Sequence, residues 1–156
     1  MIGVRKYKEL WEYVASQIPL ISNVIMVDDE TELSKKISDV ENNDILLVAA
    51  FPSSDLDQLD EDNLGDVDTC VVYVLQKLDL RNVNDDDLML ERETTQNILR
   101  EIRMLMLSLA GDWENFNDKT NLMRQIIRSK QHIDRERNYF GCNGYSLSFS
   151  IRTNGI

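Results

Sequence analysis

The chain has 156 residues, of which 42% are hydrophobic and 29% are charged, and its formal net charge is −11. This length and composition predict a single domain, residues 1–156, whose core needs no disulfide or structural metal. The negative charge repels nucleic acids and anionic membranes, so neither is expected as a partner.

The first forty residues predict a helix, a strand and a second helix. Arg5–Ile18 places its apolar residues at helical spacing and is followed by a proline, which ends the helix. The short β-branched run Val24–Val27 predicts a strand. A second helix is expected to run to about Val40, with Asp28 and Asp29 interpreted as residues that cap its N-terminus.

Two apolar runs form the expected centre of the domain. Ile45–Phe51 and Cys70–Leu75 are apolar on successive residues, so we expect neighbouring strands with both faces covered. The segment between them, Pro52–Asp68, holds seven carboxylates and no lysine or arginine. It is predicted to be a loop, because proline cannot donate a hydrogen bond to a sheet ladder and should end the first strand.

The second half of the chain predicts one long helix and a further element of ambiguous type. Residues 88–110 repeat apolar side chains at helical spacing, and this helix is expected to cover one face of the sheet. Asn121–Arg128 also fits a helix, which we favour, although a strand through 124–132 is an open alternative.

The C-terminal segment predicts the last strand. Between Tyr145 and Thr153, apolar residues alternate with serines and an arginine, which is typical of a strand with one apolar and one solvated face. Asn143-Gly144 is a hairpin-turn dipeptide, so Asn138–Cys142 is expected to pair back as a short strand. The fold class predicted is therefore α+β, with a mixed or antiparallel sheet of about four to five strands. The long helix, about 88–110, and the N-terminal helix cover this sheet.

Opposite charges concentrate in different parts of the chain. Residues 28–68 hold 14 of the 28 acidic residues, whereas residues 119–137 hold six basic residues. Two such regions can meet head to tail between copies and close a ring, but for the charge runs alone we favour two solvated faces of a monomer, because charge runs are usually solvated. The candidate interaction residues are Asp55, Asp57, Asp60, Glu61, Asp62, Arg128, Arg135 and Arg137.

No catalytic signature is present in the sequence. The chain lacks a phosphate-binding loop, a nucleophile elbow and cysteine–histidine spacing for zinc, and the acidic segment does not fit the EF-hand frame. The lone His132 is interpreted as a surface residue. We therefore predict no catalytic, cofactor-binding or metal-binding residues. An enzyme of a type that this sequence does not reveal is the remaining alternative to the two non-enzymatic functions given below.

The cysteine content and the absence of export signals bear on location. The two cysteines, Cys70 and Cys142, are expected to be free thiols in a reducing compartment. The N-terminus has no long apolar segment typical of a secretion signal, and no apolar run has the roughly 18 residues that cross a bilayer. The cytoplasm is the expected location.

The order of elements resembles that of the small α+β tail-completion or tail-terminator proteins of long-tailed bacteriophages. Four segments carry this resemblance: DILLVAAFP (44–52), DTCVVYVLQKLD (68–79), TTQNILREIRMLMLSLAG (94–111) and GCNGYSLSFSIRT (141–153). It implies a non-enzymatic subunit that forms a ring on the tail tube, partners that are copies of itself or other structural proteins, and a place in the virion. The alternative is a binding domain for a small ligand or protein partner in a cellular pathway, with segment 53–68 as its site.

Overall fold

The computed structural model describes residues 1–60 and 63–153, and the side chains of these residues except 30 and 56–64. Within these ranges the chain forms four helices and five strands. In chain order they are α1 (Val4–Ser16), β1 (Asn23–Val27), α2 (Glu30–Ser38), β2 (Ile45–Asp60), β3 (Asn63–Lys77), α3 (Asp85–Gly111), α4 (Asp118–Arg124), β4 (Ile126–Tyr139) and β5 (Cys142–Thr153).

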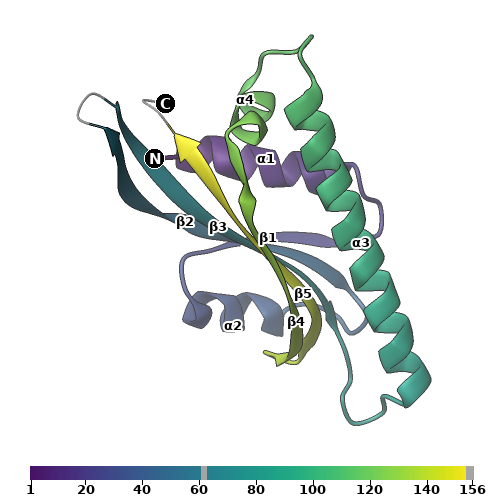
Figure 1. Ribbon diagram of the computed structural model, residues 1–156. Coiled ribbons are helices and arrows are strands. Elements are labelled where there is room, and N and C mark those ends of the chain that lie inside the picture. Colours follow the sequence, from purple (N-terminus) through teal and green to yellow (C-terminus); the bar gives the residue numbers. More distant parts are fainter. Residues whose placement is uncertain (61–62, 154–156) are drawn as a thin grey trace.

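The five strands form one mixed sheet in the order β1-β2-β3-β5-β4. β1 runs parallel to β2, and the other neighbouring pairs are antiparallel. Helices α1, α3 and α4 pack on one face, and the shorter α2 packs on the other (Figure 1). The predicted α+β fold, with the long helix and the N-terminal helix over the sheet, is confirmed.

The larger core lies between the sheet and α1, α3 and α4. The side chains of Tyr7 and Trp11 on α1 are fully buried, and their ring centroids lie 6.0 Å apart in an edge-to-face arrangement. Trp11 also contacts Phe149 of β5 at 6.1 Å between centroids. Because α1 places its apolar residues at helical spacing, one face of the helix fills this core.

Both apolar runs are buried on both faces, as predicted. Leu47 of β2 and Val72 of β3 face the larger core, whereas Leu46 and Val48 face the α2 side. Continuous apolar strands are the expected consequence of a sheet covered on both sides.

The acidic segment is not a loop. In the structure β2 continues to Asp60 and β3 begins at Asn63, so the two strands form a long hairpin. The pairing shifts between Ala50 and Ser53, and Pro52 lies at this bulge. A proline is tolerated at a bulge because the ladder hydrogen bond that it cannot donate is not needed there. Pro52 therefore redirects the strand and does not end it.

The predicted turn at Asn143-Gly144 was also wrong. Both residues lie inside β5, and the chain turns at Phe140 and Gly141, whose φ angles are 52° and 78°. Gly144 is needed for a different reason: a Cβ there would lie 1.8 Å from the carbonyl oxygen of Val74 on β3. The long strand β4 replaces the short strand expected over Asn138–Cys142.

The ambiguous segment after the long helix contains both predicted elements. Asp118–Arg124 is helix α4, capped by Asn117, and β4 begins at Ile126. The serine face of β5 differs from the prediction because it is largely covered: Ser146 and Ser150 are only 7% and 8% exposed. β5 lies between β3 and β4, so side chains of its neighbours shield these small residues.

Candidate functional site

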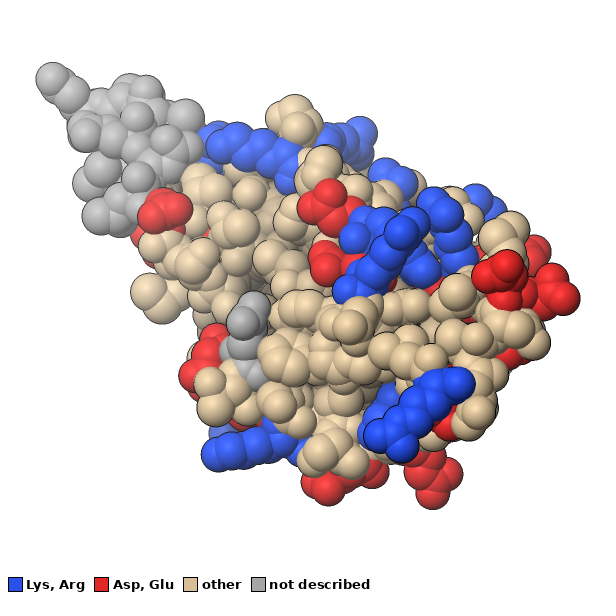
Figure 2. All heavy atoms as spheres, turned by 90° about the horizontal axis from the view of Figure 1, so that it is seen from below, with Lys and Arg blue, Asp and Glu red and all other residues tan. Residues whose placement is uncertain are grey.

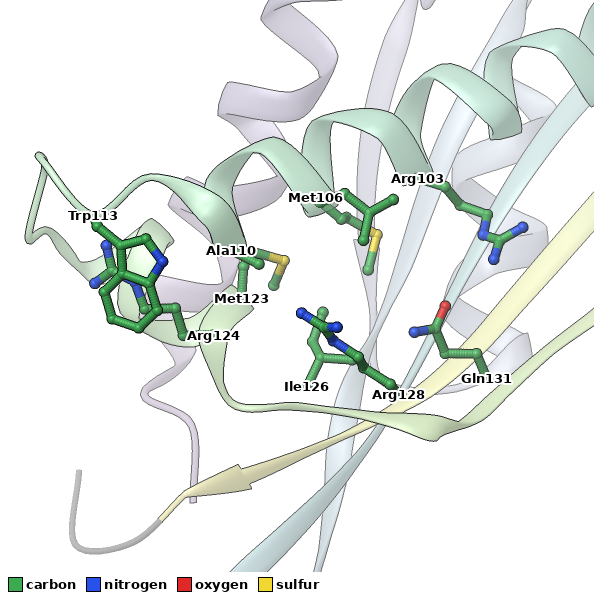
Figure 3. A pocket seen from close by; sticks show the side chains of 10 residues that line it. Arg103, Met106, Ala110, Trp113, Met123, Arg124, Ile126, Arg128 and Gln131 are labelled. Carbon is green, nitrogen blue, oxygen red and sulfur yellow. The ribbon is translucent and has the colours of Figure 1, made fainter.

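A pocket of about 240 Å³ lies between the C-terminal half of α3, α4 and the start of β4 (Figure 3). Its lining combines buried apolar side chains with three arginines and contains no carboxylate. The lining residues are Arg103, Met106, Leu107, Ala110, Trp113, Met123, Arg124, Ile126, Arg128 and Gln131. In a protein of net charge −11, this hollow is a local concentration of positive charge.

Two of the three arginines are available to a ligand. Arg103 on α3 and Arg128 on β4 are exposed, and neither has a hydrogen bond or ion pair within the described residues. In Figure 3, Arg103 and Gln131 lie opposite each other at one end of the pocket, and Arg128 extends into the space between α3 and β4. A guanidinium offers several N–H donors in a planar fork, which suits carboxylates and phosphates.

The third arginine, Arg124, is already bound within the protein. Its guanidinium lies 4.6 Å from the ring centroid of Trp113 and 4.8 Å from that of Phe116. It also donates hydrogen bonds to the backbone carbonyls of Asp112 and Asn115. These contacts hold the link between α3 and α4 at one end of the pocket, where Trp113 is 68% exposed.

The turn after α3 is fixed by its own hydrogen bonds. The Asp112 carboxylate accepts from the side-chain amide of Asn115 at 2.9 Å and from the backbone N–H groups of Asn115 and Glu114. These hydrogen bonds, above all the one from the Asn115 side chain, lower the pKa of Asp112. The wall of the pocket that carries Trp113 is therefore ordered by local polar contacts.

A bulge in the edge strand places Arg128. Ile126 pairs with Ile151, but the next paired residue of β4, Gln131, faces Phe149, so four residues of β4 lie between positions only two apart on β5. Such a bulge twists an edge strand and changes where its side chains point. Ile126 contributes to the apolar floor with Met106 and Met123, which are 4% and 1% exposed.

The hairpin of β2 and β3 is the second notable feature, and we call residues 53–66 of it the acidic arm. The ladder between the two strands continues to the pair Asp60–Asn63. Within the described residues, β5 accompanies β3 only as far as the pair Asp66–Thr153. The arm therefore extends past the end of β5, and Figure 1 shows it projecting beyond the body of the sheet.

The five predicted acidic interaction residues belong to this arm. Asp55 is exposed on β2. Asp57 and Asp60 are also on β2, but their side chains lie outside the described part of the structure. Glu61 and Asp62 lie outside the described residues altogether.

The two other carboxylates of the segment have structural contacts. Oδ2 of Asp68 is buried and accepts hydrogen bonds from the backbone N–H of Ile2 at 2.6 Å and from Oγ1 of Thr153 at 3.3 Å. Asp66 lies 2.5 Å from the amino group of Met1. The base of the acidic arm is thereby tied to both the first residues and the end of β5.

The structure does not bring the three predicted basic residues together. Arg128 lines the pocket described above, and Arg135 forms an ion pair with the buried Glu91. Arg135 also lines a separate hollow near the start of α3 together with the exposed Arg137, so these two residues lie near each other and away from the pocket of Arg128. Arg128 and Arg137 are nine positions apart along β4, a span of at most about 30 Å. Charged side chains of both signs are interspersed on the face seen in Figure 2.

Arg103, Arg124 and Trp113 belong to the pocket but are not among the predicted site residues. Trp113, Phe116, Arg124 and Arg128 lie within one stretch of 16 residues. This closeness in the chain is the only signal in the sequence that links these four residues. The folding of α3 against β4 supplies Arg103, which lies more than 20 residues earlier in the chain.

The histidine, the cysteines and the acidic side chains of the described residues form no further candidate site. No group of three or more histidine, cysteine or acidic side chains there could hold a metal ion. Cys70 and Cys142 are free thiols, as expected, and both are buried. His132 is exposed, as expected, and lies 3.0 Å from Asp134. No helix in the described part of the chain is long and apolar enough to cross a membrane.

No protein-family model matches the chain, and no curated protein sequence matches it.

Proposed function

We propose that the protein is a non-enzymatic structural subunit that assembles with copies of itself through two different surfaces. The observation that carries this proposal is the separation of the acidic arm from the arginine pocket on one subunit. Two unlike, complementary surfaces produce head-to-tail contacts, which close into a ring when the rotation between subunits permits. The exposed edge of β4 offers further backbone groups to a neighbour.

Within this class, we propose a component of a bacteriophage or prophage tail, similar to the tail-completion and tail-terminator proteins. The order helix, strand, helix, two strands, long helix and C-terminal strand supports this assignment, whereas α4 and β4 are additions to the layout on which the resemblance rests and a hairpin takes the place of its long loop. Such a subunit would accumulate in the cytoplasm and end in the virion. Its partners would be copies of itself and the tail-tube protein.

Analytical ultracentrifugation tests the proposed assembly. Purified protein is sedimented across a concentration series from about 1 to 200 µM, at low and at high salt. We expect discrete oligomers that grow with concentration and weaken with salt, since exposed charge contacts are screened. A strict monomer at every concentration that also fails to cosediment with tail-tube protein contradicts the proposal.

The pocket favours a second candidate function, a binding domain for a small anionic ligand. The two available arginines, Arg103 and Arg128, beside buried methionines suit a molecule with an acidic group and an apolar part. Thermal shift with a panel of fatty acids, aromatic carboxylates and phosphates tests it, because a ligand that binds only the native state raises the melting temperature. A rise in melting temperature that Arg128→Glu abolishes supports ligand binding. The absence of a rise with every compound of the panel contradicts this function.

A further inference from the structure

We infer that the pocket between α3 and β4 receives the acidic arm of a second copy, specifically residues 53–60 on β2. This inference rests on the proposed function and names its contact. It assigns the arginine pocket as the receiving surface and the acidic arm as the inserted element of the same head-to-tail interface.

The pocket has the chemistry that such a segment requires. Arg103 and Arg128 carry positive charges that no acidic side chain of the described residues neutralises. Between them lies an apolar floor in which Met106 and Met123 are almost fully buried. A complementary ligand therefore presents carboxylates next to apolar side chains.

Residues 53–60 have this composition. They include Asp55, Asp57 and Asp60 together with Leu56 and Leu59, and no lysine or arginine. Extended backbone suits insertion beside an edge strand, because its N–H and C=O groups can pair with those of the neighbour. The start of β4, where the ladder with β5 is interrupted between Ile126 and Gln131, borders the pocket.

The acidic arm cannot fill the pocket of its own subunit in this conformation. In Figure 1 it projects away from α3 and β4, and no side chain of the arm that the structure describes lines the pocket. Points that lie far apart in a projection lie at least as far apart in space. The arm and the pocket therefore meet only between different copies.

Paired charge reversals test the contact. The pocket variant carries Arg103→Glu and Arg128→Glu, and the arm variant carries Asp55→Lys and Asp57→Lys, so each reverses two charges. Arg124 is left unchanged because it holds the turn after α3. A matched control, Arg81→Glu with Arg137→Glu, reverses two exposed charges that do not line the pocket. Circular dichroism and thermal melts confirm that every variant is folded.

We expect each reversal alone to weaken self-association at least tenfold in sedimentation, whereas the control behaves like the wild type. An equimolar mixture of the two variants should assemble again. In the mixture the native arm meets the native pocket and the reversed arm meets the reversed pocket, so both contacts are complementary. A single chain that carries all four reversals should assemble for the same reason.

The possible failures are distinguishable. A monomeric wild type overturns the proposed assembly as well as this contact. A wild type that assembles while both reversals leave its oligomeric state unchanged overturns only the inferred contact. Failure of the mixed variants to reassemble also overturns it. Loss of a fatty-acid or phosphate thermal shift in the pocket variant, with self-association unchanged, assigns the pocket to a small anion instead.

Discussion

The guanidinium of Arg135 on β4 lies 2.6 Å from the carboxylate of Glu91 on α3, and the Glu91 side chain is fully buried. The same guanidinium donates to the carbonyl of Gly144 at 3.0 Å and lies 5.1 Å from the ring centroid of Tyr145. Thr95 completes the site by donating to the Glu91 carboxylate. The hydrogen bonds to Glu91 raise the pKa of Arg135, and the ion pair ties the long helix to the edge strand.

Replacement of Arg135 by methionine should destabilise the fold strongly. Arg135→Met leaves the Glu91 carboxylate buried without its charged partner, which typically costs about 3–5 kcal/mol. Urea unfolding measures this loss. Arg137→Met, two residues along β4 and exposed, is the matched control and should change the free energy of unfolding by less than about 0.5 kcal/mol. Equal effects of the two substitutions contradict a structural role for the Glu91–Arg135 pair.

Gly144 should tolerate no side chain. A methyl group at this position would overlap the backbone carbonyl of Val74 on β3. Because β3 and β5 are neighbours in the sheet, Gly144→Ala requires these two strands to separate. We expect Gly144→Ala to be insoluble or to lose at least about 3 kcal/mol of stability.

The control for this prediction is Gly111→Ala at the end of α3. Apart from the adjacent residues and the helix's own backbone, no atom of the described residues lies within 4 Å of the added methyl group there, and alanine is favoured over glycine in a helix by roughly 0.5–1 kcal/mol. Comparison of melting temperatures should therefore show opposite signs for the two substitutions. A Gly144→Ala protein that melts with the wild type would mean that β3 and β5 are not paired in this register.

The buried framework was predictable from the sequence because its signals are local and redundant. Ile45–Phe51 and Cys70–Leu75 are apolar on successive residues, and α3 repeats apolar side chains over many turns. Asp29 caps α2 as expected, since its side chain accepts from the backbone N–H of Glu32 at 2.9 Å. Each of these sequence patterns favours a single local structure, and that structure agrees with the burial seen in the fold.

The acidic arm and the turn were mispredicted because two residue types have more than one structural use. Pro52 ends many strands but here lies at a bulge, so the acidic residues that follow it continue β2. Gly144 is common in hairpin turns but here permits close contact with Val74. The pocket was not predictable, because Arg103 and Arg128 are brought together only by the packing of α3 over the sheet.

The buried thiol of Cys70 should make the protein less stable in alkaline solution. Burial raises the pKa of Cys70 to about 12, with a smaller contribution from Asp68, so the folded protein keeps this thiol neutral. An unfolded chain has a cysteine pKa near about 8.5 and releases the proton above that pH. The contribution of the neutral Cys70 thiol to the free energy of unfolding is therefore fully present below about pH 8.5, and it is lost as pH rises toward the folded-state pKa.

Urea unfolding at pH 8 and at pH 10, under reducing conditions, measures this effect. Cys70→Ala removes the titrating group and should lose about 1–2 kcal/mol less stability over this interval than the wild type. The comparison within one variant cancels the constant cost of the substitution itself. Parallel losses in the two proteins would show that Cys70 ionises as readily in the folded state as in the unfolded chain.

Asp68 should be required to anchor the base of the acidic arm. Asp68→Ala removes the acceptor for the Ile2 N–H and the Thr153 hydroxyl, and unpaired buried polar groups cost about 1–3 kcal/mol. Hydrogen exchange should increase at Ile2 and along the last residues of β5. Asp55→Ala is the control, since Asp55 is exposed, and it should leave exchange at both places unchanged. Unchanged exchange in Asp68→Ala contradicts this role.

Arg124 should order the wall of the pocket through the shape of its side chain and not through charge alone. Arg124→Lys keeps the positive charge but cannot lie between Trp113 and Phe116 while also donating to two carbonyls. We expect faster proteolysis between residues 112 and 117 and a change in Trp113 fluorescence, with Trp11 buried and unaffected. Arg100→Lys, on exposed helix surface, should change neither. The substitution keeps the positive charge at position 124 and leaves Arg103 and Arg128 unchanged. An Arg124→Lys protein that resists proteolysis like the wild type would therefore show that charge alone orders this wall.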